Sequence, residues 1–328
     1  MRSLLKTLAS LRLTLVGLVW LILNAIAVSQ WPDGAIPWLV LPLALLALNL
    51  LAAILVNRTF RLQSALLVFH VGLLGVLILV AAGVLVRFDG QIELVEGEHF
   101  DPAAVRPMSR GWLHPRRMQN VEFSQGPIEV RYVSGLRRDT THSTLNMSDE
   151  GSSYTFGDRQ GFSSHGYRFM TTPNKGFSVL LLWEDVDGNE GLGAVNFPSY
   201  PEFEWKQQNE WTTPSGEQLT LELDLGTGVP EDSAWTLNSD VEFELLVRNE
   251  EGETLALAPG DSLSIAGGRM TVADLRLWMG YRIDYDPFLS WLLAAAFLSL
   301  GALTVHVQQK FRAPRGATVN ALGRQQEA

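Results

Sequence analysis

The chain has 328 residues, 47% of them hydrophobic, a net charge of −10 at pH 7 and no cysteine. The lack of cysteine excludes disulfides, thiolate metal sites and any cofactor attached through a thiol of this chain. The charge is uneven, since residues 88–287 hold thirty-three of the thirty-five acids and fifteen basic residues, a net −18. So acidic a segment argues against nucleic acid as a partner.

Four apolar runs stand out, at residues 11–28, 35–56, 62–86 and 288–307. Each is close to the ~20 residues that a helix needs to cross ~30 Å of hydrocarbon. None contains Asp, Glu or Lys. They predict a membrane protein with four transmembrane helices, three in an N-terminal membrane region (1–87) and one near the C-terminus, followed by a tail at 308–328.

The lysines and arginines near these runs predict the orientation. They gather before the first run, between the second and third, and after the fourth: Arg2, Lys6, Arg12, Arg58, Arg61, Lys310, Arg312, Arg315 and Arg324. The turn Trp31-Pro32-Asp33-Gly34 has none. The positive-inside rule then places both termini in the cytoplasm and residues 88–287 outside the cytoplasmic (inner) membrane, on the periplasmic side. Trp31, Trp38 and Trp291 fall where interfacial aromatic residues contact lipid headgroups.

Residues 1–27 also allow a second interpretation. A basic start, an apolar stretch and Ala25-Ile26-Ala27 are typical of a cleaved signal peptide. Cleavage would leave the topology of the remaining chain unchanged, and an intact mass would decide.

The segment 88–287 has the pattern of β structure. Strands are predicted at 128–133, 177–183, 219–225 and 241–247, with strict alternation of leucine and polar residues from Leu219 to Leu225. Hairpin turns are predicted at 185–188 and 248–252, and a short helix at 271–278. We expect a large, mostly-β domain, sandwich or barrel-like, inserted between the third and fourth helices.

This β segment lacks the usual catalytic signatures, such as a nucleophile elbow, a phosphate-binding loop or a zinc motif. The run 185–190 is similar to a calcium loop but lacks its last glutamate. His99, His142 and His165 are scattered. His114 lies in a basic and aromatic stretch (106–117) that could contact lipid headgroups, a partner or a carboxylate ligand. A lipid contact or an ordinary loop is favoured. The chain alone is therefore not expected to be an enzyme.

His70 differs from the other histidines because it lies in the apolar run 62–86. Eight residues from Leu62 correspond to ~12 Å along a helix, a depth inside the hydrocarbon. Ionisable residues there are costly and face a partner or a cavity. A neutral imidazole is a common metal ligand and an axial ligand for heme iron. The alternative is a neutral histidine hydrogen-bonded to a neighbouring helix, for instance to Asn49.

The apolar run 62–86 also shows which sides of the predicted helix differ in composition. Three glycines predict close packing against another helix: Gly72, Gly75 and Gly83. They lie largely off the face that carries His70, Leu73, Leu74 and Leu77. The histidine face is therefore the one that we expect to be offered to another molecule.

Several short motifs occur in a familiar order. They are Leu11-Arg-Leu-Thr-Leu15, Phe69-His70-Val-Gly-Leu, Phe88-Asp-Gly-Gln with Leu94-Val-Glu-Gly-Glu98, and Tyr281-Arg-Ile-Asp-Tyr-Asp-Pro287 leading into the last helix. With the layout of three helices, β domain and one helix, the chain resembles the ResB/CcsB family of cytochrome c biogenesis (System II).

This resemblance implies a role in cytochrome c maturation. Members act with a tryptophan-rich ResC/CcsA-type membrane partner, carry heme outward and present it, reduced, to apocytochrome c. A histidine of the family's third helix is implicated in holding heme, which here implies His70 as the cofactor and metal ligand, with heme shared transiently with the partner. The compact outer domain and the lack of cysteine depart from larger relatives, so a divergent paralogue stays open.

A second hypothesis from another class needs no cofactor. In it the chain is a membrane-anchored binding or scaffold protein whose β domain recognises an envelope protein. It predicts no bound heme and retained function when the third helix is replaced by a generic apolar helix.

Overall fold

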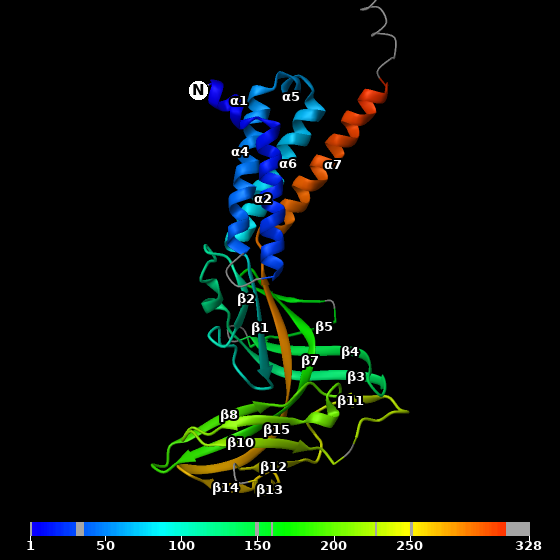
Figure 1. Ribbon diagram of the computed structural model, residues 1–328. Helices are drawn as coiled ribbons and strands as arrows, with labels where there is room; N and C mark the ends of the chain where they lie inside the picture. The colour runs from blue at the N-terminus through cyan, green and yellow to red at the C-terminus, as the bar shows by residue number, and fades with distance from the viewer. Residues whose placement is uncertain are drawn as a thin grey trace, which may run out of the picture. The chain divides into compact units, whose positions relative to one another are not determined.

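The computed structural model describes residues 2–30, 36–147, 151–158, 160–226, 228–249 and 252–312 (Figure 1). The chain divides into two compact units. The first holds the described residues up to Phe88, the segment Met108–Pro115 and the described residues from Tyr285 onward. The second holds Asp89–Pro107 and Arg116–Asp284. We call Met108–Pro115 the docked loop, because it belongs to the helical unit although its first three residues form the end of strand β2 (Arg106–Arg110).

The first unit is helical. Its elements are α1 (Arg2–Leu8), α2 (Leu11–Gln30), η1 (Ile36–Leu39), α4 (Val40–Val56), α5 (Arg58–Leu62), α6 (Ser64–Val86) and α7 (Leu289–Arg312). Three of them, α2, α6 and α7, are long and apolar enough to span a membrane, while α4 is apolar but has 17 residues. The prediction of a membrane protein with long apolar helices is confirmed for these three spans. The predicted turn at 31–34, including Trp31, and the basic residues Arg315 and Arg324 lie outside the described residues.

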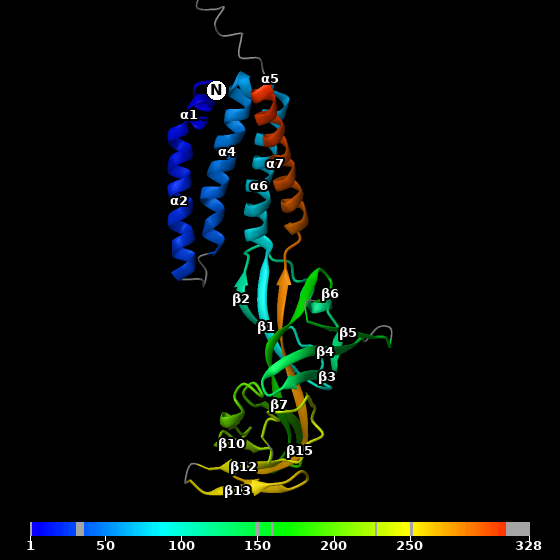
Figure 2. The ribbon, with the colours of Figure 1, turned by 90° about the vertical axis from the view of Figure 1, so that its right-hand side faces the viewer.

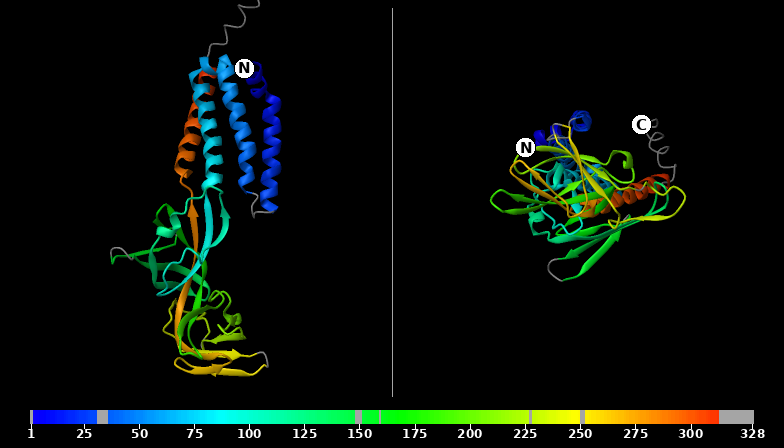
Figure 3. Two further views of the ribbon diagram at one scale, coloured as in Figure 1. Left: turned by 90° about the vertical axis from the view of Figure 1, so that its left-hand side faces the viewer. Right: turned by 90° about the horizontal axis from the view of Figure 1, so that it is seen from below.

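The four long helices stand side by side in one row, in the order α2, α4, α6, α7 (Figure 2). Figure 3 shows the same row from the other side. The predicted glycine packing is confirmed for the tightest contact: Gly72 is buried, and a Cβ placed there would collide with the Ser299 hydroxyl of α7. A Cβ at Gly75 would touch Ala295, also of α7, whereas one at Gly83 would meet nothing. Gly72 and Gly75 thus lie on the face of α6 that packs against α7, and Gly83 does not contribute to this contact.

The second unit is built from antiparallel sheets. Their strands are β1 (Phe88–Val95), β2 (Arg106–Arg110), β3 (Phe123–Ser134), β4 (Arg137–Met147), β5 (Ser153–Gly157), β6 (Phe162–Ser164), β7 (Tyr167–Asp185), β8 (Glu190–Asn196), β9 (Gln208–Thr212), β10 (Gln218–Asp224), β11 (Trp235–Leu237), β12 (Glu244–Arg248), β13 (Thr254–Leu257), β14 (Ser262–Ile265) and β15 (Gly268–Tyr285). Two short 3-10 turns, η2 (Arg117–Asn120) and η3 (Glu204–Lys206), complete it.

These strands form three sheets among the described residues. The seven-stranded sheet runs β2-β1-β15-β7-β6, with β14 added to β15 and β8 to β7. Two four-stranded sheets run β13-β12-β10-β9 and β11-β3-β4-β5. The long strands β7 and β15 pair along most of their lengths, and β15 leads directly into α7 (Figure 1). The predicted large β region between the third apolar helix and the last one is therefore confirmed.

The helix predicted at 271–278 is wrong, because these residues lie in β15. Val272 and Leu275 are both buried and three residues apart, which imitates a helix face. The pairing with β7 explains the spacing: its register shifts between Val272 and Asp274, at a β-bulge. A bulge inserts one residue and moves the alternation of side chains by one position.

The other strand predictions fare better. Residues 128–133 lie in β3 and 177–183 in β7, and Leu219, Leu221 and Leu223 of β10 are buried as the alternation predicts. The run 241–247 becomes a strand only from Glu244. The turn at 185–188 connects β7 to β8, and its Gly188 has a positive φ of 83°. The turn at 248–252 connects β12 to β13, but residues 250 and 251 lie outside the described residues.

Candidate functional site

A long groove of about 710 Å³ lies within the helical unit and is lined mainly by apolar side chains. Helix α4 provides its floor, with residues spaced three or four apart such as Leu46, Leu50 and Ala53. Helices α2 and α6 flank α4 in the row and provide the two walls. Phe60 of α5 and residues of α1 line it as well. We call this cavity the His70 groove.

The α6 wall of the groove consists of the face singled out by sequence. His70, Leu73 and Leu77 all line the cavity, while Leu74 is not among its lining residues. Gly72, on another face, contacts α7. The histidine face and the glycine face of α6 thus differ, as expected, while the binding of another molecule to the histidine face stays a prediction.

His70 itself is held at one ring nitrogen. Its Nδ1 lies 2.7 Å from the carbonyl oxygen of Leu66, one turn earlier. A carbonyl only accepts hydrogen bonds, so Nδ1 carries the hydrogen and donates it, and Nε2 keeps its lone pair. The ring stacks on Phe60, with centroids 4.1 Å apart and an angle of 23°, and meets the edge of Phe69 at 4.9 Å. This half-buried imidazole is thus oriented by its Nδ1 bond, and its Nε2 has no hydrogen-bond partner among the described residues.

Asn49, the example given for a hydrogen-bond partner of His70 on a neighbouring helix, bonds other residues instead. Its Nδ2 donates to the carbonyl oxygens of Leu8 (2.5 Å) and Ser10 (3.1 Å). Its Oδ1 accepts from the Thr14 hydroxyl at 2.7 Å. Asn49 is 5% exposed, and these bonds give both of its polar side-chain atoms a partner at the junction of α1 and α2. A buried amide that is satisfied in this way stabilises helix packing.

The docked loop is fixed to the end of α6. The backbone amides of Gly111 and Leu113 donate to the carbonyl oxygens of Arg87 (2.9 Å) and Leu85 (2.8 Å). His114 Nδ1 donates to the Val86 carbonyl at 2.8 Å, and its ring packs against aromatic neighbours. Burial is the main cause that lowers the pKa of His114. His114 therefore has a structural role, and the lipid contact expected for its stretch stays a prediction.

The remaining histidines do not gather into a site. His99 forms an isolated bridge with Ser124, His165 occupies a turn with φ of 51°, and His142 lies in β4. His306 lines a separate polar cavity. In the described ranges, three or more His, Asp or Glu residues never come together in a way that could hold a metal ion. Any metal held by His70 would need its further ligands from a cofactor or another chain.

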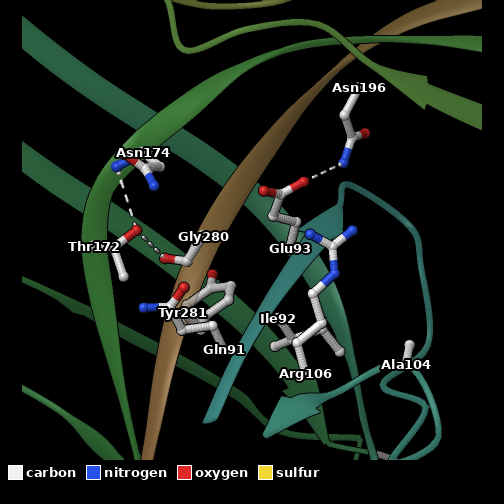
Figure 4. A pocket seen from close by; sticks show the side chains of 10 residues that line it. All are labelled: Gln91, Ile92, Glu93, Ala104, Arg106, Thr172, Asn174, Asn196, Gly280 and Tyr281. Carbon is white, nitrogen blue, oxygen red and sulfur yellow. Dashed lines mark hydrogen bonds between the residues drawn. The ribbon is translucent and has the colours of Figure 1, made fainter. Parts of the chain in front are cut away.

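A second, smaller pocket of about 210 Å³ lies within the β unit (Figure 4). Some polar groups that line the pocket hydrogen-bond one another. Asn196 donates to Glu93 at 3.1 Å, and the Thr172 hydroxyl donates to the Gly280 carbonyl at 3.1 Å. Arg106 of β2 also lines it. This pocket could not be predicted from the sequence, because its residues come from β1, β2, β7, β8, β15 and the segment before β2, which non-local pairing brings together. Its volume is below the ~300 Å³ typical of small-molecule sites.

Compared with protein-family models and with curated proteins, the chain matches none. Any function assigned to the His70 groove therefore depends on its geometry and on the short sequence motifs described above.

Proposed function

We propose that the protein is a cytochrome c maturation factor that helps to carry heme across the cytoplasmic membrane and present it to apocytochrome c. It acts with a ResC/CcsA-type membrane partner. The observation that carries this proposal is the His70 imidazole, whose Nε2 is free of a hydrogen-bond partner among the described residues and which lines a largely apolar groove.

The residues of the groove fit a heme. Neutral imidazole is a common axial ligand of heme iron, and a backbone hydrogen bond at the other ring nitrogen fixes the tautomer and orientation of a metal-bound histidine. The leucines and alanine of the walls and floor suit a porphyrin ring. When bound, heme would supply a redox-active iron centre, and His70 would hold that iron. Because His70 is the one histidine that lines the groove among the described residues, any further protein ligand to the iron would come from the partner.

The protein's own residues would perform three tasks at this site. Leu66 holds the His70 ring through its carbonyl, and Phe60 stacks on one side of the imidazole. The apolar side chains of α2 and α4 exclude water from the groove. The lining residues come from α1, α2, α4, α5 and α6 and from the residues that join them, and in the proposal a partner helix would complete the site.

The proposal includes four membrane spans. Helix α4 has 17 residues, about 26 Å at 1.5 Å per residue, which is near the lower limit for spanning. The distribution of basic residues then supports cytoplasmic termini and a periplasmic β domain. Lipid contacts the exposed leucines of α2, such as Leu15 and Leu23.

The test is to co-express the full chain with a ResC/CcsA-type partner and apocytochrome c, and to compare His70→Ala with His306→Ala. His306 is a matched control because it lies in α7 and does not line the groove. We expect His70→Ala to lower both the heme that co-purifies and the amount of mature cytochrome, while His306→Ala leaves both unchanged. Equal heme and equal maturation in the two variants would refute the proposal.

The scaffold hypothesis keeps one supporting observation. The β7–β8 hairpin exposes large apolar side chains, Val186 at 82% and Leu192 at 65%, which a partner protein could cover. This hypothesis predicts that replacing both with serine abolishes function while His70→Ala does not. The opposite pattern supports heme carriage.

A further inference from the structure

Lys6 lines the same groove as His70, from helix α1. Its side chain is exposed and makes no ion pair with the part of the chain that the structure describes. Within residues 2–30 and 36–88 there is no Asp or Glu at all. The ammonium group therefore has no counter-charge from the described helices around the groove, although it borders an otherwise apolar cavity.

Lys6 occupies this place because α1 is held there. Asn49 of α4 binds the carbonyl oxygens of Leu8 and Ser10, which lie at the break between α1 and α2. Asn49 is buried, so its two donated bonds fix the junction firmly. The amide thus links the floor of the groove to the helix that carries Lys6.

Three kinds of group therefore line the same groove: the imidazole of α6, apolar side chains, and the ammonium group of α1. A lysine ammonium is a compact point charge that pairs with carboxylates, and a charge-assisted hydrogen bond beside an apolar surface is stronger than a neutral one. This combination suits a ligand that is flat, largely apolar and carries carboxylate groups at its edge.

We propose that Lys6 binds a carboxylate substituent of the ligand whose iron His70 coordinates. The inference rests on the proposed function, because it takes that ligand to be heme. It makes the groove selective for porphyrins with free carboxylates over porphyrins whose carboxylates are esterified.

The experiment uses the full chain in a non-ionic detergent and two metal-free fluorescent probes, protoporphyrin IX and its dimethyl ester. Neither probe has iron, so binding does not require coordination by His70. We expect the wild type to bind the diacid more tightly than the ester. Lys6→Gln should weaken diacid binding by roughly tenfold, the loss of one charge-assisted bond, and leave ester binding unchanged. Lys310→Gln is the control, since Lys310 lines another cavity, and should bind both probes as the wild type does.

Three results would overturn the inference. Diacid binding that is equal in wild type and Lys6→Gln would show that the ammonium does not contact the carboxylate. Equal weakening by Lys310→Gln would indicate a general charge effect. Displacement of the diacid by anionic phospholipid micelles, in a manner that requires Lys6, would assign the ammonium to lipid phosphate instead.

Failure of the proposed function looks different. If heme itself binds with the same spectrum in wild type and His70→Ala while the diacid still depends on Lys6, the iron ligand is wrong and the carboxylate contact stands. If the heme spectrum depends on His70 and the diacid does not depend on Lys6, only the carboxylate contact is lost.

Discussion

Replacing Tyr281 with phenylalanine removes a single oxygen atom, but it should destabilise the β unit strongly. The Tyr281 hydroxyl donates to Gln125 Oε1 at 2.6 Å and lies 2.5 Å from the Ser143 hydroxyl. Gln125 Nε2 in turn donates to Ser143 at 3.0 Å. All three side chains are at most 1% exposed, so water cannot replace the missing hydroxyl.

The expected magnitude follows from this network. Two hydrogen bonds of about 1 kcal/mol each are lost, and Gln125 Oε1 is left as a buried acceptor without a donor, at about 1–3 kcal/mol. Allowing for overlap between these costs, we expect about 2–4 kcal/mol, or a fall in Tm of about 4 to 16 °C for a domain of this size. Thermal unfolding of the full chain, followed through the β signal in circular dichroism, measures it.

Tyr132→Phe is the matched control. Tyr132 is nearly as buried, at 2% exposure, but its hydroxyl has no hydrogen-bond partner among the described residues. Phenylalanine keeps the ring that stacks on Trp235 at 4.3 Å. We expect a change within about 0.5 kcal/mol. Similar losses in the two variants, or no loss in Tyr281→Phe, would refute the reasoning from the network.

Further predictions concern packing, charge and pH. Gly72→Val should destabilise the α6–α7 contact by about 1–3 kcal/mol, whereas Gly83→Val, where a Cβ meets nothing, should be tolerated; thermal stability in detergent compares them. Glu202→Gln should cost about 1–2 kcal/mol by removing the partner of Lys175, which is 1% exposed, whereas Lys175→Met should be near neutral in denaturant unfolding. Since burial lowers the pKa of His114 below its ordinary 6.5, its stabilisation is complete above that value and is lost as the pH falls through the lower, folded-state pKa. Hydrogen exchange in the docked loop, corrected for intrinsic rates, should therefore accelerate on acidification, and less so in His114→Asn.

The helices could be predicted because a long apolar run indicates an apolar environment, whichever residues surround it. Their ends were less predictable. The run at 35–56 begins as a 3-10 turn and becomes α-helix only at Val40, and the last helix continues five residues beyond 307, to Arg312. In the β unit, alternation located β10 well. It failed at 271–278, because the bulge that shifts the side chains depends on pairing with β7, about ninety residues away.

The candidate site was predictable only in part. An imidazole within a long apolar run stands out in any sequence, and the face shared by His70, Leu73 and Leu77 follows from the helical repeat. The role of Asn49 could not be deduced, because several helices offered partners and the packing order α2, α4, α6 decides which one it meets. Phe60 stacks on His70 only because the chain breaks between α5 and α6, at Gln63.

The central claim, that His70 Nε2 coordinates iron within the groove, is tested most directly by adding heme to the purified full chain and recording visible and resonance Raman spectra. We expect a histidine–iron signature in the wild type that is lost in His70→Ala and restored when free imidazole is added to that variant. An unchanged signature in His70→Ala, or a loss that imidazole does not restore while the variant remains folded, would contradict it.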